Sequence, residues 1–76
     1  MDERRIGRFF IRRELFEQVK DYMGIELGRP VSDDEADGFL ARNQPLLGSI
    51  VGYDEVDTED RSRIWECCRT DPLLPR

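Results

Sequence analysis

The sequence predicts an all-α fold, a small single-domain bundle of about four short helices with short connections. Apolar residues recur at helical spacing in several segments, and prolines and glycines separate those segments. The chain of 76 residues is long enough for one small core. We therefore expect one domain over residues 1–76, with residues 1–8 and 71–76 as loose ends.

The first helix is expected from Phe9 to Met23, where the apolar residues share one face. Gly24 occupies the position where a left-handed residue ends a helix, and Ile25 is expected to fold back on the last turn. Residues 4–10 fit either a first helical turn or a short extended segment at the N-terminus, and both readings remain open.

A second helix is expected to begin near Ser32 and to end before Pro45, with Ala36, Phe39 and Leu40 facing inward. Pro45 suits the first turn of a short third helix, which Gly52 would end. The apolar face of this third helix is Leu46, Leu47, Ile50 and Val51. The alternative is a short buried strand, because two of these residues are β-branched.

A fourth helix is expected from Asp57 or Thr58 to about Arg69. Its buried side would be Ile64, Trp65 and Cys68. The two prolines in the tail "DPLLPR" exclude a further helix there, although its leucines can pack back on the bundle.

Charge is distributed unevenly along the chain. The formal net charge is −5, yet residues 21–60 hold eleven acids against two arginines, a net charge of −9. The segments on either side are both net positive. Blocks of like charge repel one another, so this acidic middle calls for an explanation, of which solubility is the simplest.

The stretch "SDDEADGFLARN", residues 32–43, has the spacing of a calcium-binding loop. However, the position that needs a bidentate glutamate is the neutral Gln44, and Ala41 replaces another ligand. A capping box explains the same residues, because Ser32 is followed three positions later by Glu35. We therefore expect a helix start here, and neither a metal nor a cofactor in this protein, which has no histidine.

The second acidic run is "YDEVDTED", residues 53–60, which also leads into a predicted helix. The starts of these two helices would lie side by side in a small bundle and form one acidic surface. The hypothesis assigns partner binding to Asp33, Asp34, Glu35, Asp37, Asp54, Glu55, Asp57, Glu59 and Asp60. Carboxylates at helical spacing lie about as far apart as successive phosphates of a nucleic-acid strand. Solvation alone is the competing interpretation.

A basic stripe is expected on the first helix, away from its apolar face. It consists of Arg4, Arg5, Arg8, Arg12 and Arg13. Nucleic-acid binding is one use for such a stripe. The other interpretation is that Arg12 and Arg13 pair with Glu17 and Glu14, or with the acidic middle of the fold.

The runs "SDDEAD" and "YDEVDTED", on a short helical chain without a catalytic motif, give a resemblance in size and charge. In these respects the chain resembles the small acidic inhibitors that phages encode against host defence, anti-CRISPR proteins among them. The resemblance implies a monomeric binding protein that blocks the basic nucleic-acid groove of a partner, for example a Cas effector subunit. The Arg-rich first segment departs from a uniformly acidic mimic and favours a contact of mixed charge.

The expected function is therefore inhibition by protein binding in the cytoplasm, the host's cytoplasm if the chain is phage-encoded. We expect no enzymatic activity, no membrane association and no direct contact with nucleic acid. One alternative is a small transcriptional regulator or antitoxin-like protein that binds nucleic acid through the basic stripe. A second alternative is a structural module that dimerises through the first helix.

Overall fold

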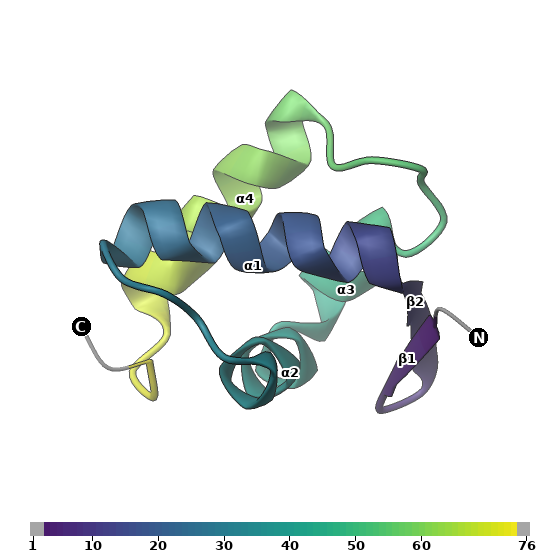
Figure 1. Cartoon of the computed structure of the whole chain (residues 1–76), viewed down its shortest axis with the longest axis horizontal. Coiled ribbons are helices and arrows are strands. Elements are labelled where there is room, and N and C mark those ends of the chain that lie inside the picture. The colour runs from purple at the N-terminus through teal and green to yellow at the C-terminus, as the bar shows by residue number, and fades with distance from the viewer. Residues whose placement is uncertain (1–2, 75–76) are drawn as a thin grey trace.

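The protein consists of four helices and one β-hairpin, as the computed structural model describes them for residues 3–74 (Figure 1). The elements in chain order are β1 (Glu3–Ile6), β2 (Phe9–Arg12), α1 (Arg13–Leu27), α2 (Asp33–Arg42), α3 (Gln44–Ile50) and α4 (Thr58–Thr70). The predicted small helical bundle is confirmed, and the fold is mostly helical but not purely all-α, because residues 3–12 form a two-stranded antiparallel sheet.

The hairpin occupies most of the segment that was expected to be a loose end, and it also replaces the predicted start of the first helix. Ile6 pairs with Phe9, and Arg4 pairs with Ile11. The connecting turn has Gly7 in its first central position, with φ of +60°, as tight hairpin turns of this length require. The extended reading of residues 4–10 was therefore the right one. Residues 1–2 and 75–76 lie outside the described part of the chain.

The end of α1 also differs from the expectation. Gly24 is helical, and the left-handed residue is Gly28, with φ of +71° and its N–H donating to the Gly24 carbonyl at 2.8 Å. Ile25 is exposed instead of folding back on the last turn. Glycine at position 24 allows the backbone of Arg29 to lie close to α1, because a Cβ at position 24 would be only 3.1 Å from the Arg29 carbonyl oxygen.

The other three helices form close to the residues at which the sequence predicts them. Ala36, Phe39 and Leu40 of α2 are fully buried. The buried residues of α3 are Leu46, Leu47 and Ile50, so the alternative of a buried strand is excluded; this helix ends at Ile50, before the predicted stop. In α4 the residues Ile64 and Cys68 are buried as expected, while Trp65 is half-buried. Of the two tail leucines, only Leu74 is buried.

One hydrophobic core joins all six elements, with Phe16 and Phe39 as its largest fully buried side chains. Helix α1 runs through the middle of the molecule; α2 lies on one side of it and the start of α4 on the other (Figure 1). Trp65 ties α4 to α1, because its indole N–H donates to the Tyr22 carbonyl at 2.9 Å and its ring meets the Tyr22 ring edge-on. None of the helices described here combines the length and the apolar character that spanning a bilayer requires.

Candidate functional site

The first acidic run begins α2 through a capping box. The Ser32 hydroxyl accepts a hydrogen bond from the Glu35 backbone N–H at 3.1 Å, and the Glu35 carboxylate accepts one from the Ser32 N–H at 3.3 Å. Hydrogen bonds from Arg29 lower the pKa of Glu35, despite its partial burial. Among the residues described, no group of acidic or cysteine side chains has the arrangement of a metal site. The residues of the supposed calcium loop therefore form a helix start.

Replacing Ser32 with alanine should lower the free energy of unfolding by about 1 kcal/mol, because the Glu35 N–H loses its acceptor. Adding millimolar calcium should leave the melting temperature of the wild type unchanged. Thermal unfolding followed by circular dichroism measures both effects. A clear rise of the melting temperature with calcium would contradict the assignment of these residues to a cap.

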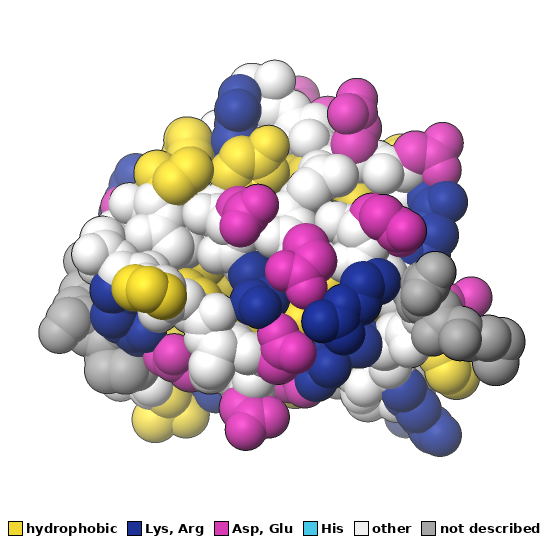
Figure 2. Space-filling view, viewed as in Figure 1, with side chains coloured by type: hydrophobic (Ala, Val, Ile, Leu, Met, Phe, Trp, Pro, Cys, Tyr) yellow, Lys and Arg dark blue, Asp and Glu magenta, His cyan; other side chains and the backbone are white. Residues whose placement is uncertain are grey.

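The same carboxylates are neutralised by bases from other elements. Arg4 reaches from β1 to Asp37, with its Nε 3.1 Å from the carboxylate. Asp33 accepts a hydrogen bond from Lys20 at 2.6 Å, which lowers the pKa of Asp33, and it lies 3.5 Å from Arg4. Arg13 is a further neighbour of Asp33, at 3.9 Å. Acidic and basic side chains accordingly lie next to one another across the middle of the face in Figure 2.

The basic stripe is therefore not a stripe on a helix. Four of its five arginines belong to the hairpin, and only Arg13 is in α1. The predicted pairing of Arg12 and Arg13 with the acidic middle is present, at Asp54 and Asp33, and Arg13 also makes the i,i+4 pair with Glu17. Arg5 and Arg8 alone among the five make no ion pair with a described carboxylate. The stripe thus keeps little charge for an external partner.

The second acidic run contains residues with different roles. The Asp57 carboxylate caps α4 by accepting from the Asp60 N–H at 2.8 Å. The Asp60 side chain is buried, with the residue only 3% exposed, so its assignment to an acidic surface is wrong. Burial, together with the nearby Asp57 carboxylate, raises the pKa of Asp60. Glu55 and Glu59 are exposed and make no ion pair within residues 3–74.

The two helix starts do not form one surface. The beginning of α2 lies on one side of α1, and the loop that leads to α4 lies on the other side (Figure 1). The expectation that the two acidic runs lie side by side is therefore wrong. Helix α1 packs against both α2 and α4, and so keeps their starts apart.

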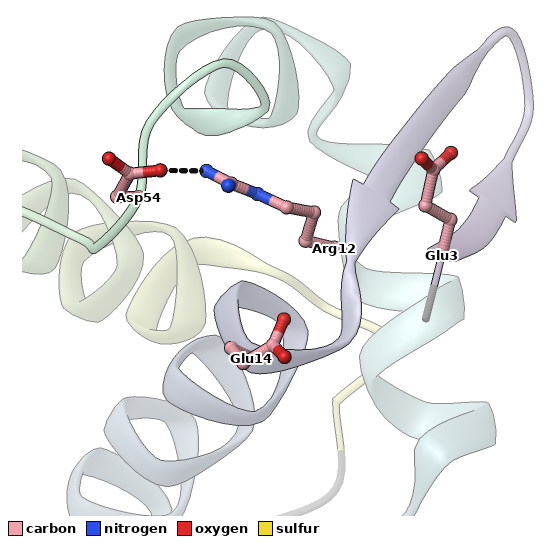
Figure 3. A pocket seen from close by; sticks show the side chains of 4 residues that line it. All are labelled: Glu3, Arg12, Glu14 and Asp54. Atoms are coloured by element: carbon pink, nitrogen blue, oxygen red, sulfur yellow. Dashed lines mark hydrogen bonds and ion pairs between the residues drawn. The ribbon is translucent and has the colours of Figure 1, made fainter. Parts of the chain in front are cut away.

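A hollow of about 360 Å³ opens where the hairpin, the start of α1 and the loop before α4 meet. Its lining residues are Glu3, Arg12, Glu14 and Asp54 (Figure 3). Arg12 donates to the Asp54 carboxylate at 2.6 Å and also to the Tyr53 carbonyl. Glu3 and Glu14 have no such partner among the described residues. Three carboxylates and one guanidinium thus line the hollow, and the guanidinium is bonded to only one of these carboxylates, that of Asp54.

We call Glu3, Glu14, Asp54, Glu55 and Glu59 the carboxylate surface. Acidic side chains gather above the loop between α3 and α4 at the upper right of Figure 2. The sequence hypothesis missed Glu3 and Glu14, because Glu3 precedes two arginines, Glu14 follows two arginines, and both are far from residues 54–59 in the chain. The hairpin register places Glu3 opposite Arg12. Glu3 can be assigned to this surface only when that strand pairing is known.

Asp34 is the remaining member of the predicted acidic set. It is exposed in the first turn of α2, where its charge adds to the field around Arg4. Helix α1 lies between the start of α2, which carries Asp34, and the loop before α4, which carries Asp54 and Glu55 (Figure 1). Comparison of the chain with protein-family models, with curated proteins and with solved structures found no match.

Proposed function

We propose that this protein is a small inhibitor that binds another protein and occupies its basic nucleic-acid-binding surface, as an anti-CRISPR protein does with a CRISPR effector complex. The proposal rests on one observation: basic side chains of the same chain pair with most of the acids in one acidic run and with few in the other. The run at 33–37 is largely paired with Arg4, Arg13, Lys20 and Arg29. Within residues 3–74, by contrast, the carboxylate surface has one ion pair, between Arg12 and Asp54.

The excess negative charge supports contact with a basic partner. Exposed carboxylates that lack a cation within the chain gain most when a partner supplies one, and they speed the encounter through their field. Such an attraction is screened beyond about 8–10 Å at physiological ionic strength. The proposed complex should therefore weaken as salt is raised.

The alternative of a nucleic-acid binder has less support. Phosphate binding needs a group of uncommitted bases, and Arg4, Arg12 and Arg13 are each bonded to a carboxylate of the same chain. A gel-shift titration with random duplex at low salt separates the two functions, because the proposed inhibitor should not retard DNA.

Reversal of Glu55 and Glu59 to lysine should weaken partner binding about tenfold or more, because it places cations opposite the partner's basic surface. The assay is displacement of a fluorescent duplex from the nucleic-acid-binding protein recovered by affinity capture from host cells. The matched control reverses Asp34 and Glu66 to lysine. Asp34 lies in the first turn of α2 as Glu59 lies in the first turn of α4, and the second residue of each pair, Glu66 or Glu55, lies outside a first helical turn.

Each change of an acid to lysine raises the net charge by two, so each double variant has a net charge of −1 in place of −5. A loss of binding that depends only on net charge would therefore appear in both variants. The proposal is overturned if the test variant displaces the duplex as well as the wild type does, or if both variants lose binding equally.

A further inference from the structure

The outer face of the hairpin is exposed in the structure of residues 3–74. Strand alternation turns Ile6 and Ile11 into the core and leaves Glu3, Arg5, Phe10 and Arg12 on the outside. Phe10 is 56% exposed, although a phenylalanine ring of this size is usually buried. The small sheet thus presents an aromatic ring among charged side chains.

The loop before α4 adds a second exposed ring beside this face. Tyr53 is 52% exposed, and its backbone carbonyl accepts a hydrogen bond from Arg12. The same arginine lines the hollow together with Glu3, Glu14 and Asp54 (Figure 3). Arg12, on the same strand face as Phe10, therefore links the hairpin to the loop that carries Tyr53 and Asp54. Exposed aromatic side chains with a polar surround are typical anchors of protein interfaces.

We propose that this face docks a protein segment that carries a lysine or arginine next to an apolar side chain. The cation enters the hollow and pairs with Glu3 and Glu14, while the apolar neighbour covers Phe10 or Tyr53. This inference deepens the proposed function, on which it rests, by naming the docking face and the chemistry of the partner segment.

Charge complementarity selects a cation as the occupant. The Arg12 guanidinium already has two acceptors, the Asp54 carboxylate and the Tyr53 carbonyl. An incoming anion would compete with these acceptors and would also face three carboxylates. An incoming cation meets Glu3 and Glu14, which have no cation of their own among the described residues. A phosphate or a nucleic-acid strand is therefore disfavoured at this hollow.

The test is an amide NMR titration of the full chain with the capped tripeptide acetyl-Leu-Arg-Leu-amide. We expect saturable shifts at the residues of the hollow and at Phe10 and Tyr53. The same peptide with norleucine in place of arginine should bind at least about threefold more weakly, because exposed ion pairs each contribute little. Replacing both Glu3 and Glu14 with glutamine should abolish this preference for arginine, whereas replacing Asp34 and Glu66 with asparagine and glutamine should preserve it.

A second variant tests the apolar part of the surface. Phe10→Ser should weaken binding of both peptides and retain the preference for arginine. The inference is overturned if the two peptides bind equally well to the wild type, or if the shifts map away from the hairpin and the loop. The spectra of the unbound variants establish that each is folded.

The peptide titration tests the docking face, and the duplex displacement assay tests the proposed inhibitor, so either hypothesis can be rejected without the other. Selective peptide binding at this face without any displacement of nucleic acid would support the docking face and reject the proposed inhibitor. Displacement that depends on Glu55 and Glu59, with no selective peptide binding, would support the inhibitor and reject this docking face.

Discussion

Replacing Arg42 with alanine should lower the free energy of unfolding by about 3 kcal/mol, the largest effect that we expect from a change to a charged side chain. Arg42 ends α2 and binds Asp71, which follows α4, with its Nη2 2.9 Å from the carboxylate. The Asp71 side chain is only 2% exposed. The substitution would leave a buried carboxylate without its cation.

The expected cost lies at the low end of the range for broken buried pairs because Asp71 keeps other donors. Its carboxylate also accepts from the Leu73 N–H at 2.9 Å and from the Asn43 side chain at 3.4 Å. These contacts hold the tail against the bundle, where Leu74 is buried. For a domain of this size a loss of 3 kcal/mol lowers the melting temperature by more than about 10 °C.

Urea unfolding followed by circular dichroism measures the loss. Arg13→Ala is the matched control, since the Arg13–Glu17 pair is about half exposed and should contribute less than about 0.5 kcal/mol. The double variant with Arg42→Ala and Asp71→Asn should be more stable than Arg42→Ala alone, because no buried charge remains unpaired. A loss for Arg42→Ala no greater than that of the control would show that the pair contributes little.

The pH dependence of this loss has a definite sign. Burial alone would raise the pKa of Asp71, but hydrogen bonds from Arg42 and from the Leu73 N–H hold it below its ordinary value of 3.8. A lowered acid pKa means that the stabilisation is present above the ordinary value and is lost as the pH falls through the folded value. The stabilisation that this pair gives the wild type should therefore be lost below about pH 4, and the loss for Arg42→Ala should be smaller there than at pH 7.

The helices could be predicted from the sequence because their causes are local. Ser32 and Glu35 form a capping box within four residues, and Phe39 with Leu40 follows at helical spacing. The assignment of residues 9–12 to the first helix is wrong for the same reason, although the extended alternative for residues 4–10 is correct. Phe9 and Ile11 fit the apolar face of the following helix by spacing, and only the pairing of Ile6 with Phe9 across Gly7 separates the two structures.

The site was less predictable because charge pairing depends on contacts between distant residues. Arg4 and Asp37 are 33 positions apart, and Arg12 and Asp54 are 42 apart, so neither pairing follows from local spacing. The sequence did predict that arginines would meet the acidic middle. It could not show that this neutralises the start of α2 and leaves the loop before α4 with excess negative charge.

Asp60 shows the limit of local reasoning most clearly. Its position in the first turn of α4 favours an acid through the helix dipole, which is why it was assigned to the surface. Its Oδ2 atom has no hydrogen-bond partner among the described residues, and Oδ1 is 3.3 Å from the Ser49 hydroxyl. That hydroxyl has one proton and donates it to the Leu46 carbonyl at 2.8 Å. Oδ1 also accepts a hydrogen bond from the Arg63 guanidinium at 3.4 Å, so one oxygen of this buried carboxylate has partners and the other has none among the described residues.

Replacing Asp60 with asparagine should raise the free energy of unfolding at pH 7 by about 1.5 kcal/mol. Asparagine has the same shape without the buried charge, and its amide can donate a hydrogen bond to the Ser49 hydroxyl or to the Asp57 carboxylate. The lost interaction with the helix dipole offsets part of the gain, by about 0.3–1 kcal/mol, and so does the lost ion pair with the half-exposed Arg63. Urea unfolding of both proteins at pH 7 measures the difference, with Glu66→Gln on the exposed side of α4 as the control.

The gain should disappear in acid. Burial and the Asp57 carboxylate raise the pKa of Asp60 above its ordinary value of 3.8, so the folded protein binds this proton more tightly than the unfolded chain does. Wild-type stability then rises as the pH falls from above the folded value toward the ordinary value. The two proteins should converge over that window, because protonated Asp60 and asparagine are both neutral. A variant less stable than the wild type at pH 7, or a difference that does not change with pH, would show that Asp60 is stabilising in its charged form.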